Sequence, residues 1–194
     1  GSRRLVRATL PGMTAELELT SGEDVQPQIS PDGQWVAYAK AKLPGGSDYH
    51  DFNFWRLYVV SIHGAYDGRQ ENKIDDNGYW PSWGDDGELY YSQVDGNHTN
   101  IMRATLDENG RLVRKELAFS TRDAFPGIPD SNTAYGVMGH YLPAGNTPIG
   151  STRVTWYSRD EESAVTGTNE IFLQSLAGGT KQWTWSVGGT GNAD

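Results

Sequence analysis

The chain of 194 residues contains no cysteine and few basic residues. Without cysteine it has neither structural disulfides nor zinc sites built from thiolates. Only 16 Lys and Arg stand against 25 Asp and Glu, which gives a formal net charge of −9. Because an acidic surface repels a phosphate backbone, nucleic acid is disfavoured as a partner.

Long apolar runs are missing as well. No stretch approaches the roughly 18 residues of a membrane-spanning helix, so we expect no membrane span. No signal peptide is visible, and Gly1-Ser2 resembles the remnant of a cleaved tag, so we expect the native N-terminus to be missing. The absence of cysteine fits a periplasmic or secreted protein, and it fits a cytosolic protein almost as well.

Turn-forming and aromatic residues are abundant, with 24 Gly, 9 Pro, 7 Trp and 10 Tyr. This composition favours strands and the packing of one sheet on another. The length predicts one domain, or at most two, with room for a substantial core.

One hairpin pattern occurs twice, over residues 26–39 and 80–92. In each copy a short apolar run leads into an Asp-Gly turn, Asp32-Gly33 or Asp86-Gly87, and then into a second run rich in aromatic and β-branched residues. Asp-Gly supplies the positive φ angles of a tight turn between strands. A hairpin that repeats along a chain is typical of β-propeller blades or of another repeat array.

The spacing of the next strand supports blades. Strands are expected over residues 56–60, 100–104 and 170–174, and each leads to a glycine turn. From Leu57 to Ile101 is 44 residues, which agrees with the roughly 40–45 residues of a four-stranded blade. From Ile101 to Ile171 is 70 residues, and we place the excess in an insertion between residues 124 and 150.

We therefore predict an all-β protein with little helix. It forms a single propeller region over residues 1–194, built from four-stranded antiparallel blades. The expected blades cover residues 19–74, 75–120 and 121–187, and residues 188–194 begin a next blade.

The hairpin Pro-x-Ile/Trp-Ser/Gly-x-Asp-Gly, followed by Leu-Tyr or Ile-Phe and a glycine turn, resembles the TolB-type β-propeller repeat. Residues 24–64 and 78–110 match well, and the third unit matches only in its later strands. The resemblance implies the fold and says little about function. TolB-like repeats occur in periplasmic translocation proteins, in the propellers of prolyl-oligopeptidase-type peptidases, in some polysaccharide lyases and in secreted proteins of unknown role.

Three blades are fewer than the four to eight that typically close a ring. We expect either that the remaining blades belong to a longer chain or that two copies associate, for example as a six-bladed ring with a two-fold axis. Both broad faces at the ends of the series are expected to be uncovered.

In a blade, the loops from strand two to strand three and the loops between blades open on one rim, where propellers usually bind ligands. Loops on a rigid scaffold often carry function, although surface loops are polar in any case. We predict a rim that binds a protein or carbohydrate ligand, formed by His50, Asp51, Asn53, His98, Arg122, Asp123, Arg159 and Asp160.

No serine-hydrolase elbow and no Walker or Rossmann glycine pattern occurs. His140, Tyr141 and Arg153 are the one arrangement with a catalytic outline. A uronic-acid lyase needs a His or Tyr base and a cation that neutralises the substrate carboxylate. These are three common residues without a defining spacing.

Acidic residues in two turns, residues 75–78 and 107–110, raise the question of calcium, because hard oxygen ligands gather there. The candidates are Asp75, Asp76 and Asp107, with solvated turns as the alternative, and no other cofactor is expected. For Asp32, Asp85 and Asp86 we expect the ordinary role of Asp in a hairpin turn.

The tryptophans divide into two groups. We expect Trp35, Trp83 and Trp156 to be core residues, because they occupy strand positions of the repeat. Trp55, Trp80, Trp183 and Trp185 have a freer placement, and core or inter-blade packing is still expected for them over a sugar-binding surface.

The favoured function is a non-catalytic binding or interaction module of a bacterial periplasmic or secreted protein. The alternative is an enzyme or enzyme domain, either a polysaccharide lyase on acidic sugars or the propeller of a prolyl-oligopeptidase-type peptidase.

Overall fold

The computed structural model describes residues 3–8, 16–43, 54–63, 71–84, 86–95 and 98–120 with their side chains, except those of Glu16 and His98. It also describes the backbone of four later strands, over residues 137–142, 153–158, 169–175 and 180–186. Within these residues the chain is all-β, and no helix there is long and apolar enough to cross a membrane.

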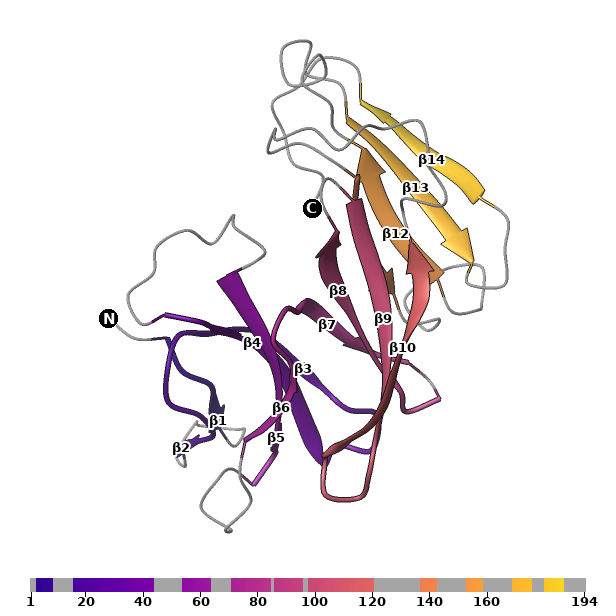
Figure 1. Cartoon of the computed structure of the whole chain (residues 1–194). Coiled ribbons are helices and arrows are strands. Elements are labelled where there is room, and N and C mark those ends of the chain that lie inside the picture. The colour runs from indigo at the N-terminus through magenta and orange to yellow at the C-terminus, as the bar shows by residue number, and fades with distance from the viewer. Residues whose placement is uncertain are drawn as a thin grey trace.

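Three four-stranded antiparallel sheets follow one another along the chain (Figure 1). The strands of each sheet stand side by side in chain order. The first sheet contains β3 (Asp24–Ile29), β4 (Trp35–Ala41), β5 (Trp55–Ser61) and β6 (Asn72–Asp75). The second sheet contains β7 (Tyr79–Trp83), β8 (Leu89–Asp95), β9 (His98–Leu106) and β10 (Leu112–Ser120).

The third sheet contains β11 (Val137–Leu142), β12 (Arg153–Ser158), β13 (Asn169–Ser175) and β14 (Thr180–Ser186). Its first strand, β11, contacts β7, β8 and β9 of the second sheet. The expected insertion over residues 124–150 is therefore wrong for residues 137–142. Strand β11 lies in a Gly-rich stretch and pairs with β12. The sequence did not indicate it, because no Asp-Gly pair stands between these two strands.

The two predicted Asp-Gly turns are confirmed. Gly33 and Gly87 have φ angles of 70° and 79°. Asp32 Oδ1 accepts hydrogen bonds from Ser30 Oγ at 2.5 Å and from the Gln34 backbone N–H at 3.0 Å. The expected turn role of Asp32 is thus confirmed, whereas Asp85 lies outside the described residues.

The first strands of these two sheets carry matching β-bulges. Gln26 and Trp80, each followed by a proline, have φ angles of 57° and 47°, and the pairing register shifts beside both. A proline cannot donate to the ladder and is tolerated at a bulge. The Trp80 backbone N–H donates to Gln26 Oε1 at 2.8 Å, which joins the two bulges across the sheets.

The main core lies between the first and second sheets. Leu57, Val59 and Ile74 of the first sheet pack in one cluster with Leu89 and Tyr91 of the second. Burial of these apolar faces is the dominant favourable contribution to their association.

The structure tests the predicted packing of tryptophans in the first two sheets. Trp35 and Trp83 belong to the main core cluster, as predicted. Trp55 is only 3% exposed, because its ring packs with Tyr79 and Ala39 between the sheets, which agrees with the expected packing between blades. The side chains of Trp156, Trp183 and Trp185 lie outside the described part.

A hairpin of β1 (Val6–Ala8) and β2 (Glu16–Glu18) covers the other face of the first sheet. Its Leu5 and Leu17 pack against a cluster of Leu19, Val36, Tyr38 and Val60. Figure 1 shows it on the side of this sheet that faces away from the second sheet. The expectation that both end faces are uncovered is therefore wrong for the first sheet, because chain preceding the first blade folds back onto it.

Candidate functional site

A pocket of about 640 Å³ opens at one end of the first and second sheets. The β3–β4 turn, the β7–β8 turn and the β9–β10 turn form it, and the lining atoms come from residues 30–32, Gln34, Trp35, Trp83, Asp86-Gly87 and residues 106–108. We call this cavity the inter-sheet pocket.

Two tryptophans line the inter-sheet pocket from the core side. Trp35 begins β4 and Trp83 ends β7, and they are 8% and 7% exposed. Trp83 Nε1 donates to the Gln28 carbonyl oxygen at 3.1 Å, which ties the second sheet to the first. A Cβ atom at Gly110 would lie 2.5 Å from the Trp35 ring, so the β9–β10 turn closes against that ring.

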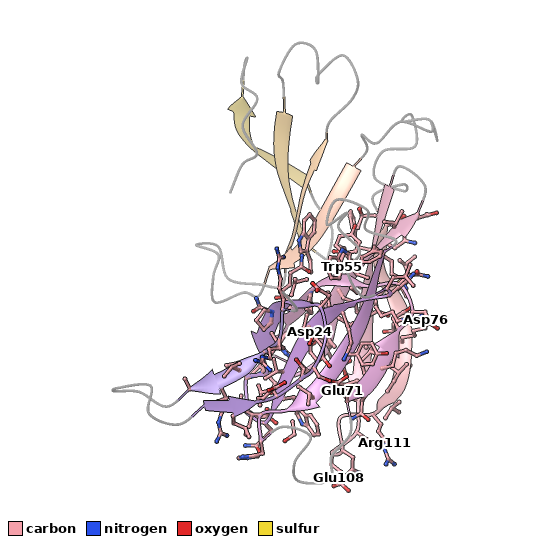
Figure 2. The ribbon with its side chains drawn as sticks, turned by 90° about the vertical axis from the view of Figure 1, so that its left-hand side faces the viewer. Asp24, Trp55, Glu71, Asp76, Glu108 and Arg111 are labelled. Carbon is pink, nitrogen blue, oxygen red and sulfur yellow. The ribbon has the colours of Figure 1, made fainter. Side chains whose placement is uncertain are left out.

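Four carboxylates also line the pocket: Asp32, Asp86, Asp107 and Glu108. The three aspartates use Oδ1 in their own turns. Asp86 accepts from the Glu88 N–H at 3.1 Å, and Asp107 accepts from the Asn109 and Arg111 N–H groups at 2.9 and 2.8 Å. Glu108 lies at the tip of the β9–β10 turn, at the lower edge of Figure 2.

The pocket is strongly negative. Its lining contains no Lys or Arg, and none of its four carboxylates belongs to an ion pair of the described residues. Hydrogen bonds from Ser30 and from the Gln34 backbone hold the pKa of Asp32 below its ordinary value. Asp32 is therefore ionised at neutral pH. Six other acidic residues do form ion pairs: Glu18, Asp24, Glu71, Asp75, Asp76 and Glu116.

The predicted binding rim consists of loops from strand two to strand three and of loops between blades, whereas the pocket is formed by the β3–β4, β7–β8 and β9–β10 turns. His98 begins β9, and only its backbone is described. The other rim residues lie outside the described part: His50, Asp51, Asn53, Arg122, Asp123, Arg159 and Asp160.

The three catalytic candidates lie on neighbouring strands of the third sheet. His140 and Tyr141 are in β11, where they pair with Thr155 and Val154 of β12. Arg153 begins β12 and pairs with Leu142. Their side chains are outside the described part.

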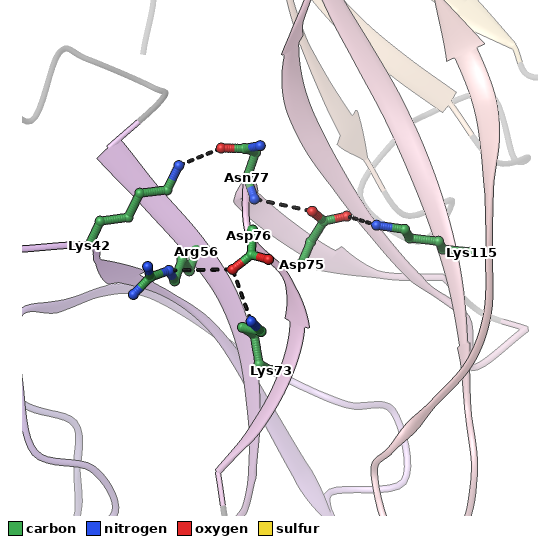
Figure 3. Close-up of polar contacts among 7 residues, drawn as sticks. All are labelled: Lys42, Arg56, Lys73, Asp75, Asp76, Asn77 and Lys115. Atoms are coloured by element: carbon green, nitrogen blue, oxygen red, sulfur yellow. Dashed lines mark hydrogen bonds and ion pairs between the residues drawn. The ribbon is translucent and has the colours of Figure 1, made fainter.

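Asp75, a calcium candidate, is held by three donors, and Figure 3 shows two of them, Asn77 and Lys115. Its Oδ2 accepts from Tyr91 Oη–H at 2.6 Å and from Lys115 Nζ at 2.7 Å, and its Oδ1 accepts from the Asn77 N–H at 3.1 Å. Burial and the bond to Asp75 raise the pKa of Tyr91 above its ordinary value, so the phenol stays a donor.

Asp76, the adjacent candidate, also faces cations. Its Oδ1 lies 3.0 Å from Lys73 Nζ and 3.5 Å from Arg56 Nε. Lys42 Nζ donates to Asn77 Oδ1 beside it (Figure 3). Across the described residues, no three His, Cys, Asp or Glu side chains are grouped to hold a metal ion.

Comparison with known proteins identifies the fold alone. No family model and no curated protein sequence matches the chain. A crystal structure of a puromycin hydrolase mutant complexed with PGG is similar over 87% of this chain, with 17% identity and a TM-score of 0.50. The structure of the Dos1 propeller is similar over 81% of this chain and 49% of its own, with 11% identity and a TM-score of 0.39, too low to carry an argument.

These sheets and the first of these likenesses define an all-β chain of propeller-type blades. The chain spans 25% of the puromycin hydrolase chain that it matches.

The pocket could have been found only in part from the sequence. Its signal is the equivalent placement of Asp32 and Asp86, each close to a core tryptophan of the repeat, Trp35 and Trp83. The contribution of Asp107 and Glu108 depends on how the β9–β10 turn reaches the first sheet.

Proposed function

We propose that this chain is a non-catalytic binding module of a bacterial periplasmic or secreted protein, and that its ligand occupies the inter-sheet pocket. The pocket is the observation that carries the proposal. Its volume of about 640 Å³ falls in the range of about 300–1,000 Å³ that is typical of ligand sites. Its walls are turns fixed by their own hydrogen bonds, which limits the entropy that a ligand must remove.

A blocked pocket tests this proposal. Gln34 is exposed and lines the cavity, so Gln34→Trp places a bulky ring in it. Val113 is 66% exposed on β10 and does not line the cavity, so Val113→Trp is the matched control.

Binding of a panel of neutral, acidic and basic peptides and oligosaccharides is measured by titration calorimetry. We expect at least one member to bind wild type and Val113→Trp alike and to be lost in Gln34→Trp. Binding of no member, or equal binding to both variants, contradicts the proposal.

The second candidate is a domain of an enzyme, which the likeness to puromycin hydrolase favours. Because this chain spans 25% of that protein, a peptidase active site would be supplied by the rest of a longer chain. In the polysaccharide-lyase version, His140 or Tyr141 is the base and Arg153 neutralises the uronate carboxylate.

Incubation with uronate polymers separates the lyase from the binding module. We expect no rise in the ultraviolet absorbance of an unsaturated product. A rise that His140→Ala abolishes would replace the binding proposal with the lyase.

A further inference from the structure

We propose that the inter-sheet pocket recognises the guanidinium or ammonium group of a basic side chain on a peptide segment. This inference rests on the proposed function and names the chemistry of its ligand.

Unbalanced charge is the first reason. Four carboxylates line one cavity, three of them on exposed residues, and the described ion pairs include none of them. A cation that enters the cavity is attracted by all four negative charges, whereas an anion is repelled by them. Each aspartate keeps Oδ1 in a turn, so the turns fix the positions of these charges before a ligand arrives.

The aromatic wall is the second reason. A cation within about 6 Å of a Trp ring centroid is attracted by the negative face of the ring, and Trp35 and Trp83 both line the cavity. Leu106 adds an apolar surface that suits the methylene stem of Lys or Arg. Trp and Leu side chains offer no ligand to a metal ion, and the described residues contain no group of three His, Cys, Asp or Glu that could hold one.

Size selects a peptide over a small free cation. The cavity of about 640 Å³ exceeds what one guanidinium group fills, so residues flanking the basic side chain have room inside it. Both Asp-Gly turns face open space, since a Cβ atom on Gly33 or Gly87 would meet nothing within 4 Å.

The test compares a short peptide containing one arginine with the same peptide containing the neutral isostere citrulline, using titration calorimetry on the full chain. The variant is Glu108→Gln, an exposed residue at the tip of its turn. The control is Glu18→Gln on β2, which removes an identical charge on the far face of the first sheet.

We expect the arginine peptide to bind at least tenfold more tightly than the citrulline peptide. Glu108→Gln should weaken it by about threefold, as measured for partly solvated ion pairs, and Glu18→Gln should leave it unchanged. Asp32→Asn should act like Glu108→Gln, because Asn Oδ1 still accepts the turn hydrogen bonds.

Equal affinity for the two peptides, or equal effects of Glu108→Gln and Glu18→Gln, overturns the inference. Free arginine amide that binds as tightly as the peptide overturns the assignment to a peptide and leaves a small organic cation. A neutral ligand that Gln34→Trp excludes, with no basic peptide bound, preserves the proposed function and overturns this inference alone.

Discussion

Asp24 has a fully buried carboxylate at the start of β3. Thr20 Oγ–H donates to its Oδ2 at 2.5 Å, and Lys40 Nζ lies 4.0 Å from its Oδ1. Burial is the largest influence and raises the pKa of Asp24 above the ordinary value of 3.8. The unfolded chain therefore releases this proton at a lower pH than the folded chain does.

The first prediction concerns pH and Asp24. A raised folded pKa means that its contribution to stability is fully present below pH 3.8 and is lost as pH rises through the folded pKa. The Asp24→Asn variant cannot titrate there, and its Oδ1 still accepts from Thr20. We expect the stability of Asp24→Asn relative to wild type to increase as pH rises above 3.8.

Urea unfolding of both proteins from below to above pH 3.8 measures the difference. Below pH 3.8, Asp32→Asn is the control of opposite sign, because hydrogen bonds lower the pKa of Asp32 and its contribution to stability is lost as pH falls from 3.8. A wild-type advantage over Asp24→Asn that does not change with pH contradicts the prediction.

The second prediction separates two costs at glycine. Gly33 and Gly110 both have a φ angle of 70°, a conformation in which a Cβ atom costs roughly 1–2 kcal/mol. At Gly33 the added atom meets nothing, whereas at Gly110 it meets the Trp35 ring at 2.5 Å. We expect Gly33→Ala to lower the free energy of unfolding by about 1 kcal/mol, and Gly110→Ala by about 2–4 kcal/mol.

Chemical denaturation of both variants, with Trp fluorescence as the signal, gives the comparison. Equal losses would mean that the contact with Trp35 relaxes without cost.

At the scale of strands and turns, the sequence predicted the hairpins, whose geometry depends on a few neighbouring residues. Asp-Gly turns and the apolar runs on both sides of them identified the hairpins, because these turns close within a few residues. The bulges at Gln26 and Trp80 could not be predicted this way, since Gln26 Oε1 accepts from a backbone group of another sheet. Strand β11 was not predicted, because no Asp-Gly pair separates it from β12 as in the first two sheets.

The third prediction compares two neighbouring aspartates at the end of the first sheet. Asp75 links β6 to Tyr91 on β8 and to Lys115 on β10, and its side chain is 5% exposed. Asp76 faces Lys73 and Arg56 with its side chain 63% exposed. Asp75→Ala leaves the buried Tyr91 hydroxyl without its acceptor, so we expect a loss of about 2–4 kcal/mol. Asp76→Ala should cost less than about 1 kcal/mol.

Urea unfolding of the two alanine variants measures both losses. Tyr91→Phe removes the hydroxyl itself and should restore part of the stability lost in Asp75→Ala when the two changes are combined. An additive double variant would show that Asp75 does not act through Tyr91.

At the scale of the whole molecule, the candidate site depends on how the sheets are placed. Residues 32 and 107 reach one cavity only because the β9–β10 turn extends to the first sheet, where Gly110 meets Trp35. The repeat length predicted a series of blades, but it could not show at which end of the first two sheets a pocket lies. Rim positions were instead inferred from the usual behaviour of propellers, and only the backbone of His98 among them belongs to the described residues.

The fourth prediction concerns the N-terminal hairpin as a cover for the first sheet. Leu5 and Leu17 shield an apolar face that a propeller normally packs against another blade. Replacing both with Ser should release the hairpin and expose that face, because the buried apolar area that holds it is lost. We expect the double variant to associate at micromolar concentration. Val6→Ser is the matched control, since Val6 lies in the same hairpin and is 45% exposed.

Light scattering across a dilution series measures the mass of each protein. Wild type and Val6→Ser should have the same mass, and the double variant should have a larger one that falls on dilution. If the double variant keeps the wild-type mass at every concentration, the hairpin is not what prevents association through this face. If wild type itself forms a dimer and the double variant dimerises more tightly, two copies contact each other through the first sheet when the hairpin is released. The first sheet is then the contact within the two-copy ring that the repeat count predicts. If wild type is a dimer of unchanged affinity in all three proteins, the contact lies elsewhere on the blades.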